Sequence, residues 1–280
     1  MSESIKQLLE WATQNLCAMS CSARLDSEIL LAHCLHKNRS YLLTWPEQIL
    51  TEGQRDCFRE LISRRLQPQP IAYLIGHREF YSMELITTPA TLVPRPETEL
   101  LVDTVLELID GRTSVDILEL GTGTGAIALA IKKHADAAMI VASDISADAL
   151  GVARVNAQKH HLDIEFIQSD WYQGVAQRYF DLIVSNPPYI AANDPYLSQG
   201  DLPAEPRQAL TSGESGLEAL EVIISSAGKY LKPEGWILLE HGYDQQLAVT
   251  SLLQDALFNS IKTLRDFNDL PRLTMARLAQ

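Results

Sequence analysis

The sequence lacks the features that direct a chain to, or across, a membrane. Its first ten residues contain no basic segment followed by an apolar one, so no signal peptide is expected. No apolar run approaches the roughly 20 residues that a membrane-spanning helix needs. We therefore expect a cytoplasmic protein that makes no membrane contact.

Cysteine is scarce and confined to the first fifth of the chain. The four cysteines are Cys17, Cys21, Cys34 and Cys57. In a cytosolic protein they are expected to be reduced thiols. Cys17 and Cys21 are spaced to share a helix face, and His33 and His36 are near in sequence, but a zinc site needs tighter ligand pairing than this. The pattern favours small core side chains over ligands, and no metal is expected.

Positive charge is also in short supply. The chain has 23 Lys and Arg against 36 Asp and Glu, which gives a net charge of −13. Such a field repels phosphate backbones, so no direct nucleic-acid partner is expected, although a local basic groove is compatible with the same total. The 46% of hydrophobic residues is enough for a sizeable core.

Residues 1–70 are predicted to form a small helical bundle that serves as a recognition domain. Apolar residues recur at helical spacing in two stripes, Ile5, Leu8, Leu9, Ala12 and Leu16, then Leu25, Ile29, Leu30 and Leu35. A further helix is predicted from Thr51, because Thr51 and Gln54 have the spacing of a capping box. Pro68 and Pro70 are expected to end it, since proline lacks an amide donor.

Residues 71–96 are predicted to form a connector with a short hairpin, and residues 97–280 an α/β domain. Strand-length apolar runs alternate there with amphipathic segments, which is typical of a parallel sheet covered on both faces. The runs are 115–121, 138–145, 164–170, 180–186, 235–242, 261–267 and 273–279. The last two are joined by residues 268–272 alone, too few for a parallel crossover, so the final strand should be antiparallel. Seven strands in this layout resemble the Rossmann-like methyltransferase sheet.

A glycine-rich segment follows the first of these runs and opens a helix. Glycine permits tight turns and close approach of the backbone to a ligand. The third glycine comes one residue earlier than in the dinucleotide fingerprint, which disfavours a nucleotide-dependent oxidoreductase. An acid precedes the first glycine, and the whole segment resembles the first motif of S-adenosylmethionine methyltransferases. The resemblance implies that the cofactor is held by Glu119, Gly121, Thr122, Gly123, Thr124 and Gly125.

Two further strand ends carry polar or aromatic side chains. Asp144 ends the second strand, where a carboxylate can accept both ribose hydroxyls of a cofactor. Asp170 and Trp171 follow the third strand, at a position that borders the adenine in methyltransferases. Ligands bind at the carboxyl ends of strands in open α/β sheets. A glycine turn with unrelated surface acids is the simpler alternative, but three strand ends would then have to mimic the pattern together.

The fourth strand is followed by Asn186, Pro187, Pro188 and Tyr189. The prolines stiffen the backbone and remove two donors, which leaves the Asn186 side-chain oxygen and the Pro187 carbonyl as acceptors. An amino or amide nitrogen is a poor nucleophile because its lone pair is delocalised, and two acceptors on its N–H groups would orient it for in-line attack. Tyr189 offers a face on which a planar group can stack. This segment is predicted to bind substrate and catalyse methyl transfer, with Asn186 also beside the cofactor. A rigid loop without chemistry is the commoner meaning of an isolated Pro-Pro pair.

The Asn-Pro-Pro-Tyr segment resembles the amino-methyltransferases of DNA, ribosomal RNA and release factors. Other features are similar to the bacterial peptide-chain release factor glutamine methyltransferase family: Pro-Arg-Pro-Glu-Thr-Glu at 94–99, the motif over 205–217, and a helical domain joined through 73–76. The resemblance implies transfer of a methyl group from S-adenosylmethionine to the glutamine amide of the Gly-Gly-Gln motif in class I release factors. It also implies that the N-terminal domain binds the release factor. We expect a monomer.

Some readings stay open at this point. A nucleic-acid amino-methyltransferase shares the chemistry but would need a basic, aromatic-lined surface, and a non-catalytic cofactor-binding module would share the fold. The family often has glycine after the aromatic pair Phe80-Tyr81, where this chain has Ser82. His241 is predicted to be structural. Arg95, Glu97 and Glu99 fit either a direct substrate role or a salt-bridged helix start. Glu205 and Arg207 lie in a long loop over about 191–215, which is either a lid or a passive surface loop.

Overall fold

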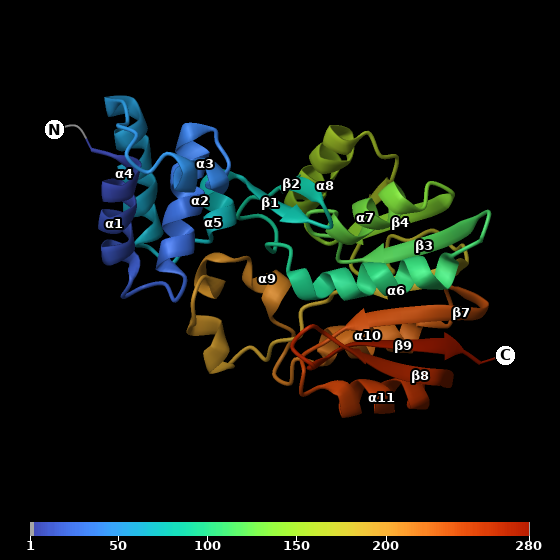
Figure 1. The fold of residues 1–280 in the computed structure, drawn as a ribbon. Coiled ribbons are helices and arrows are strands. Elements are labelled where there is room, and N and C mark those ends of the chain that lie inside the picture. The colour runs from blue at the N-terminus through green and yellow to red at the C-terminus, as the bar shows by residue number, and fades with distance from the viewer. Residues whose placement is uncertain (1–2, 280) are drawn as a thin grey trace. The chain divides into compact units, whose positions relative to one another are not determined.

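The computed structural model describes residues 3–279, which fall into two compact units (Figure 1). Of the described residues, the helical unit comprises 3–77 and 195–205, and the sheet unit comprises 78–194 and 206–279. None of the helices between residues 3 and 279 combines the length and apolarity that a membrane crossing requires.

The helical unit is built from five helices around an apolar core. They are α1 (Ile5–Leu16), α2 (Ala23–Leu35), α3 (Arg39–Thr44), α4 (Glu52–Arg65) and α5 (Ile71–Ile75). The predicted capping box before α4 is confirmed: the Thr51 amide donates to Gln54 Oε1 (3.1 Å) and the Gln54 amide donates to Thr51 Oγ1 (3.4 Å). Two short 3-10 turns at Pro195–Ser198 and Leu202–Ala204 belong to the same unit.

The buried face of α2 is partly polar, and this makes the predicted second stripe wrong at Leu25. That side chain is 40% exposed, whereas Asp26 and Glu28 are buried. The Asp26 carboxylate accepts hydrogen bonds from Arg65 Nε (3.0 Å) and from the Ser22 hydroxyl (2.9 Å). A buried carboxylate is tolerated when it is paired in this way. Hydrophobic spacing cannot identify a helix face that is buried through ion pairs.

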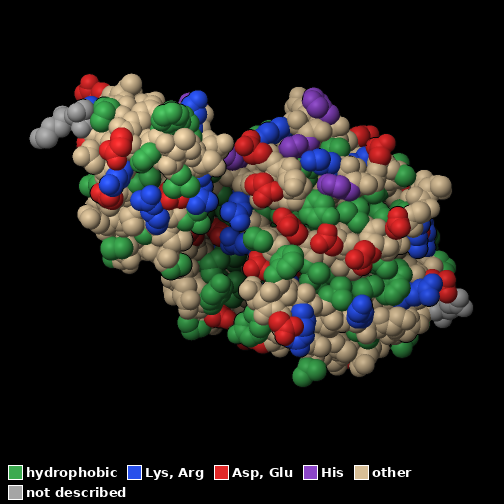
Figure 2. Space-filling model, viewed as in Figure 1, with side chains coloured by type: hydrophobic (Ala, Val, Ile, Leu, Met, Phe, Trp, Pro, Cys, Tyr) green, Lys and Arg blue, Asp and Glu red, His purple; other side chains and the backbone are tan. Residues whose placement is uncertain are grey.

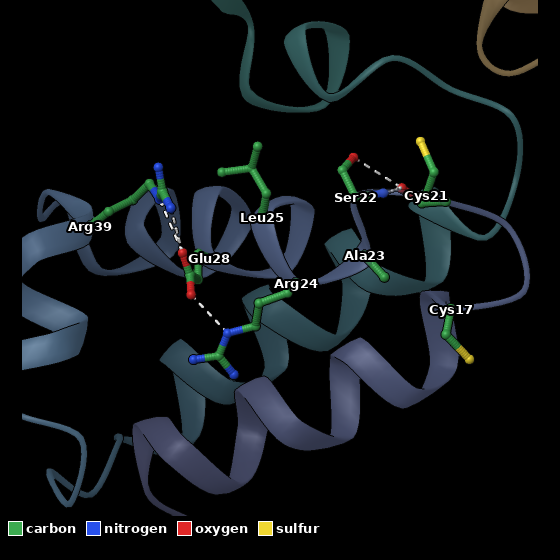
Figure 3. Close-up of a pocket in the computed structure, with 9 residues that line it drawn as sticks. Cys17, Cys21, Ser22, Ala23, Arg24, Leu25, Glu28 and Arg39 are labelled. Atoms are coloured by element: carbon green, nitrogen blue, oxygen red, sulfur yellow. Dashed lines mark hydrogen bonds and ion pairs between the residues drawn. The ribbon is translucent and has the colours of Figure 1, made fainter.

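Glu28 lies between two arginines on α2 and α3. Its carboxylate accepts from Arg24 Nε and Arg39 Nη2, each at 2.7 Å (Figure 3). The partners come from successive helices, so the three side chains link α2 to α3. The arginine side chains are about half exposed, and we assign this cluster a modest structural role.

The cysteines do not all behave as small core residues. Cys34 is buried, but Cys17, Cys21 and Cys57 are exposed, so the expectation of core positions is wrong for these three. The side chains of Cys17 and Cys21 point in different directions (Figure 3). Cys34 Sγ lies 2.8 Å from Cys57 Sγ, which joins α2 to α4. Within the described chain, His, Cys, Asp and Glu form no group of three or more suited to a metal ion.

A two-stranded hairpin and a seven-stranded sheet form the strands of the sheet unit (Figure 1). The hairpin pairs β1 (His77–Phe80) with β2 (Met83–Ile86), as predicted. The residues just before it were expected to share its extended pattern, but they form α5 instead. Pro70 precedes this helix and Gly76 caps it with φ +81°.

The large sheet has the order β5-β4-β3-β6-β7-β9-β8. Its strands are β3 (Val115–Leu120), β4 (Ala138–Asp144), β5 (Glu165–Gln168), β6 (Phe180–Ser185), β7 (Leu231–Glu240), β8 (Phe258–Arg265) and β9 (Pro271–Leu278). The predicted α/β class and the antiparallel last strand are confirmed. β9 inserts between β7 and β8 and is antiparallel to both. β7 begins at Leu231 rather than at residue 235, beside an irregular register with β6.

Helices cover both faces of this sheet. One hydrophobic cluster includes residues of α6 (Glu99–Ile109), α7 (Ala126–His134) and α8 (Ala147–His160). The other includes residues of α10 (Glu218–Ala227) and α11 (Gln246–Asp255). Because β3 pairs in parallel with both β4 and β6, the carboxyl ends of these three strands lie side by side at one end of the sheet.

Candidate active site

The glycine-rich loop connects β3 to α7 in a conformation that needs glycine. Gly121, Gly123 and Gly125 have φ values of +75°, +55° and +83°. A Cβ on Gly125 would lie 3.1 Å from Leu129 Cδ1 and 3.3 Å from Ala153 Cβ. The third glycine therefore permits close packing of α7 against α8, and the first two leave the backbone open towards the strand ends.

Glu119 supports this loop from within the protein. Its side chain is 1% exposed, and Oε2 accepts a 2.7 Å hydrogen bond from the Thr122 hydroxyl. Within residues 3–279, Oε1 finds no hydrogen-bond partner. Burial raises the pKa of this carboxyl to about 8, and the nearby Asp144 adds to the shift. A buried acceptor with spare capacity fits a ligand that carries a donor or a positive charge.

A cavity of about 450 Å³ opens beside the loop, at the carboxyl ends of β3, β4, β5 and β6. This volume suits a small organic ligand. The predicted residues that line it are Gly121, Thr122, Gly123, Thr124, Asp144, Asp170, Trp171, Asn186 and Pro188. Four predicted residues lie outside the lining: Glu119, Gly125, Pro187 and Tyr189. The loop, both later strand ends and the catalytic segment therefore share one cavity.

Asp144 stands at the end of β4 with its carboxylate fixed by backbone donors. The Gly123 amide donates to Oδ2 (2.8 Å) and the Ser146 amide donates to Oδ1 (2.9 Å). Burial raises its pKa. A carboxylate oxygen has two lone pairs, so each oxygen can accept one further hydrogen bond. The arrangement suits a pair of vicinal hydroxyls, such as those of a ribose.

Trp171 lines the cavity from a strained turn after β5. Its φ is +48°, an unusual value for a bulky residue. The Ser169 hydroxyl maintains this turn by donating to the Trp171 carbonyl (2.7 Å) and accepting from the Gly174 amide (2.7 Å). The indole lies near Gly121, since Cζ3 would be 3.9 Å from a Cβ built there. A flat ring at this place suits stacking with a heterocycle, whereas Asp170 is exposed.

The predicted catalytic segment follows β6 directly. The Ser185 hydroxyl donates to the Leu120 carbonyl (2.7 Å), which joins the ends of β6 and β3. Asn186 Nδ2 donates to Thr98 Oγ1 (3.1 Å). The Tyr189 carbonyl accepts from Gln245 Nε2 (3.0 Å), and burial raises the pKa of the Tyr189 phenol. Both ends of the segment are therefore held by side chains that are distant in sequence.

A second wall of the cavity was not predicted as a binding surface. It comes from the segment after β6 and from α10: Gln208, Ala209, Thr211, Ser212, Glu218, Ala219 and Val222. Glu218 shapes it by accepting from the amides of Glu214 (2.8 Å) and Ser215 (3.0 Å). Only the motif resemblance over 205–217 indicated this region, because it has no strand-end or glycine-loop pattern.

The charged residues whose roles stayed open have different locations. Arg95 lines the cavity, whereas Glu99 Oε1 accepts from the Tyr81 amide (2.9 Å). Glu205 is buried within the helical unit, and Arg207 Nη2 donates to the Ala192 carbonyl (2.6 Å) in the sheet unit. The 191–215 loop is therefore divided between the two units, and its lid role stays a prediction.

His241 has the structural role predicted for it. It is fully buried, and its ring nitrogens lie 2.8 Å from the Gly242 carbonyl and 2.8 Å from Thr274 Oγ1. Burial lowers its pKa, which favours the neutral ring. The preceding residue, Glu240, was missed. It is a buried carboxylate at the end of β7, and the strand-end pattern that identified Asp144 also applies to it.

Sequence comparisons identify the two parts of the chain. The family described as PrmC N-terminal domain matches residues 7–76, and the family described as Methyltransferase small domain matches residues 96–214. A release factor glutamine methyltransferase of Shewanella oneidensis is 44% identical over 274 residues, covering 98% of this chain and 96% of the relative. The enzyme of the same name from Pseudomonas aeruginosa is 44% identical over 261 residues, covering 93% and 94%.

Solved structures share the fold at low sequence identity. A methyltransferase from Pyrococcus furiosus has a TM-score of 0.54 at 18% identity, with 71% of this chain and 90% of that chain covered. A 16S rRNA methyltransferase of Thermus thermophilus, solved with AdoMet and guanosine, has a TM-score of 0.53 at 18% identity, with 72% and 49% covered. Fold and sequence together define a Rossmann-like, S-adenosylmethionine-dependent methyltransferase. More narrowly, the chain belongs to the release factor glutamine methyltransferase family.

Proposed function

We propose that this chain methylates the side-chain amide nitrogen of the glutamine in the Gly-Gly-Gln motif of class I peptide chain release factors, and so modulates translation termination. The methyl donor is S-adenosylmethionine, which leaves as S-adenosylhomocysteine, and no metal takes part. Its relatives are named for release factor glutamine methylation, which supports the substrate. The enzyme acts in the cytoplasm as a monomer, without nucleic-acid or membrane partners.

One observation carries the chemical part of this proposal. Asn186 lines the cavity, and its Nδ2 is already engaged with Thr98 Oγ1 at 3.1 Å. Its Oδ1 is therefore the end of the amide that faces a substrate, and it can only accept hydrogen bonds. An acceptor at this place selects a ligand with N–H groups. A glutamine side-chain amide has two such groups on a nitrogen whose lone pair is delocalised.

The residues in and near the cavity have two roles in this proposal, which are to bind the cofactor and to orient the substrate amide. When bound, S-adenosylmethionine supplies a methyl group on a positively charged sulfur. Asp144 is suited to accept ribose hydroxyls, Trp171 to stack on the base, and Glu119 to stabilise positive charge from below the loop. Asn186 and the Pro187 carbonyl accept the amide N–H groups and turn the nitrogen lone pair towards the donor. In this proposal Tyr189 supplies a flat surface for the planar amide, although neither it nor Pro187 belongs to the cavity lining.

The two ends of the chain have different tasks in this proposal. Residues 1–70 bind the release factor away from the reacting glutamine. Residues 97–280 hold the cofactor and the glutamine, and residues 71–96 connect these two domains. Acidic and basic side chains are intermixed on the face shown in Figure 2, and the total charge is −13. This distribution disfavours a nucleic-acid substrate.

The test is a transfer assay with methyl-labelled S-adenosylmethionine. Three acceptors are offered: a class I release factor, the same factor with its loop glutamine replaced, and duplex DNA. Asn186→Ala serves as the enzyme control. Label on the intact release factor alone, lost with either substitution, is the expected result. Label on DNA alone would replace the proposal with a nucleic-acid amino-methyltransferase, and cofactor binding without any transfer would indicate a non-catalytic module.

A further inference from the structure

A buried carboxylate lies behind the catalytic segment without touching the cavity. Glu240 ends β7 and is 2% exposed. Its carboxyl group is within hydrogen-bonding reach of the hydroxyls of Thr98 and Tyr189. Within the described chain, its Oε2 has no hydrogen-bond partner. An apolar residue would occupy this site at lower free-energy cost, so the buried acid needs a reason.

The Thr98 hydroxyl connects this carboxylate to Asn186. A hydroxyl has one proton to donate and two lone pairs with which to accept. Thr98 Oγ1 accepts from Asn186 Nδ2 (3.1 Å), so its own proton is free for the Glu240 carboxylate. In this series of hydrogen bonds, from Glu240 through Thr98 to Asn186, each donor direction is set by the preceding partner. The carboxylate orients the hydroxyl, and the hydroxyl admits only the nitrogen end of the Asn186 amide.

The same carboxylate reaches the other end of the segment. The Tyr189 hydroxyl is within hydrogen-bonding reach of Glu240, which would restrain the last residue of the segment. Arg272 compensates the charge and is itself held by Asp266, which accepts from Arg272 Nε at 3.2 Å. Asn186 and Tyr189 are thus oriented by one group on a strand that the catalytic segment does not share.

We propose that Glu240 is a positioning residue for methyl transfer: through Thr98 it fixes the amide of Asn186 with Oδ1 towards the acceptor nitrogen, and it anchors Tyr189 directly. This inference rests on the proposed function. It also explains why threonine stands between Glu97 and Glu99 in the segment at 94–99, whose role the cofactor motif leaves unassigned. Without the chain of bonds, the Asn186 amide is free to turn its N–H groups towards the substrate nitrogen, where they would repel its N–H groups.

The test uses near-isosteric variants of the full chain with the release factor as acceptor. Thr98→Val removes the hydroxyl and should lower kcat about 10- to 100-fold, as expected for loss of orientation, with the dissociation constant for S-adenosylmethionine within about twofold of wild type. Thr98→Ser restores the hydroxyl and should recover most of kcat. Glu240→Gln should lower kcat about tenfold. Thr98→Val combined with Glu240→Gln should be no slower than the slower single variant, because both interrupt one path.

The matched control is Thr104→Val in α6. Thr104 is also buried, but its hydroxyl donates to the Leu100 backbone carbonyl (2.7 Å). Its kcat should equal that of wild type. A folded Thr98→Val enzyme with wild-type kcat, or single effects that multiply in the double variant, would overturn the positioning role. A wild-type enzyme that transfers no label to the release factor would instead refute the proposed function, so the two failures are distinct.

Discussion

The Thr122 hydroxyl donates a 2.7 Å hydrogen bond to Oε2 of Glu119, beneath a loop whose first two glycines, Gly121 and Gly123, line the cavity. Among the described residues, Thr122 is the one side chain that donates to this carboxylate, the backbone of Ala128 also stabilises its charged form, and Oε1 has no hydrogen-bond partner. The loop is therefore built around a buried acid that is only partly satisfied. Such groups store a free-energy cost that a ligand or a proton can relieve.

The stability of the sheet unit should consequently depend on pH. Burial raises the pKa of Glu119 from the usual 4.5 to about 8 in the folded state. Its contribution to stability is fully present below about 4.5 and is lost as pH rises through about 8, because the folded state binds the proton more tightly than the unfolded state does. The loss is at most about 5 kcal/mol. Urea titrations between pH 5 and 9 should show this decline in wild type and a clearly flatter profile in Glu119→Gln. An equal slope in both would contradict the assignment.

Gly125 should tolerate no side chain. Gly125→Ala places a Cβ 3.1 Å from Leu129 Cδ1 at a residue with φ +83°. Left-handed backbone and overpacking together should lower the free energy of unfolding by about 2–4 kcal/mol. Gly151→Ala is the control, because Gly151 lies inside α8 with no atom within 4 Å of the added Cβ. That change should raise stability by about 0.5–1 kcal/mol. Denaturant midpoints of both variants measure the difference, and a mild Gly125→Ala would refute the packing argument.

The β1–β2 turn should gain stability from glycine. Tyr81 and Ser82 both have left-handed φ, +50° and +56°, as a two-residue type I′ hairpin turn requires. Ser82→Gly removes that strain and should raise the free energy of unfolding by about 1 kcal/mol. Ser225→Gly, in the last turn of α10, should instead lower it, by up to about the same amount. Thermal melts would decide, and a destabilised Ser82→Gly would show that the serine side chain contributes more than the turn strain costs.

The sequence predicts those parts of the site that depend on residues close together in the chain, and misses those that depend on distant partners. The glycine loop, Asp144 and Asn186 were found because each follows an apolar strand, and parallel strands bring their ends together. Leu25 was misassigned because its helix buries Asp26 and Glu28, which are stabilised by Arg65, Arg24 and Arg39. The spacing of apolar residues does not reveal ion-pair partners, because Arg65 and Arg39 belong to other helices.

Long-range pairing limits the prediction in the same way within the sheet unit. The antiparallel direction of β9 follows from its short connection, but its insertion between β7 and β8 depends on its pairing with Trp236 to Glu240 of β7. The hydrogen bond from Asn186 to Thr98 spans 88 positions in the chain. Glu240 had the same strand-end signal as Asp144, and only the structure reveals that it faces Thr98 rather than the cavity.

The pH dependence of catalysis should report on Glu240. Burial raises the pKa of this carboxyl to about 7, with Thr98, Arg272 and Tyr189 opposing the shift and Glu97 adding to it. The charge of Arg95 lowers the pKa of Tyr189, and Asp266 raises the pKa of Arg272. The ionised carboxylate is a strong acceptor for both hydroxyls, whereas the protonated acid is a weaker one, so protonation weakens the hydrogen bonds that orient Thr98 and through it Asn186.

We therefore expect kcat at saturating substrates to be high above pH 7 and to fall as pH drops through about 7. Glu240→Gln should be slower throughout and lose this inflection, since its amide does not titrate. Glu119→Gln should retain the inflection, which separates the two buried acids. Initial rates between pH 6 and 9, with the release factor checked for folding at each pH, measure the profile. A flat wild-type profile, or an inflection that persists in Glu240→Gln, would assign the titration to another group and leave Glu240 a structural role only.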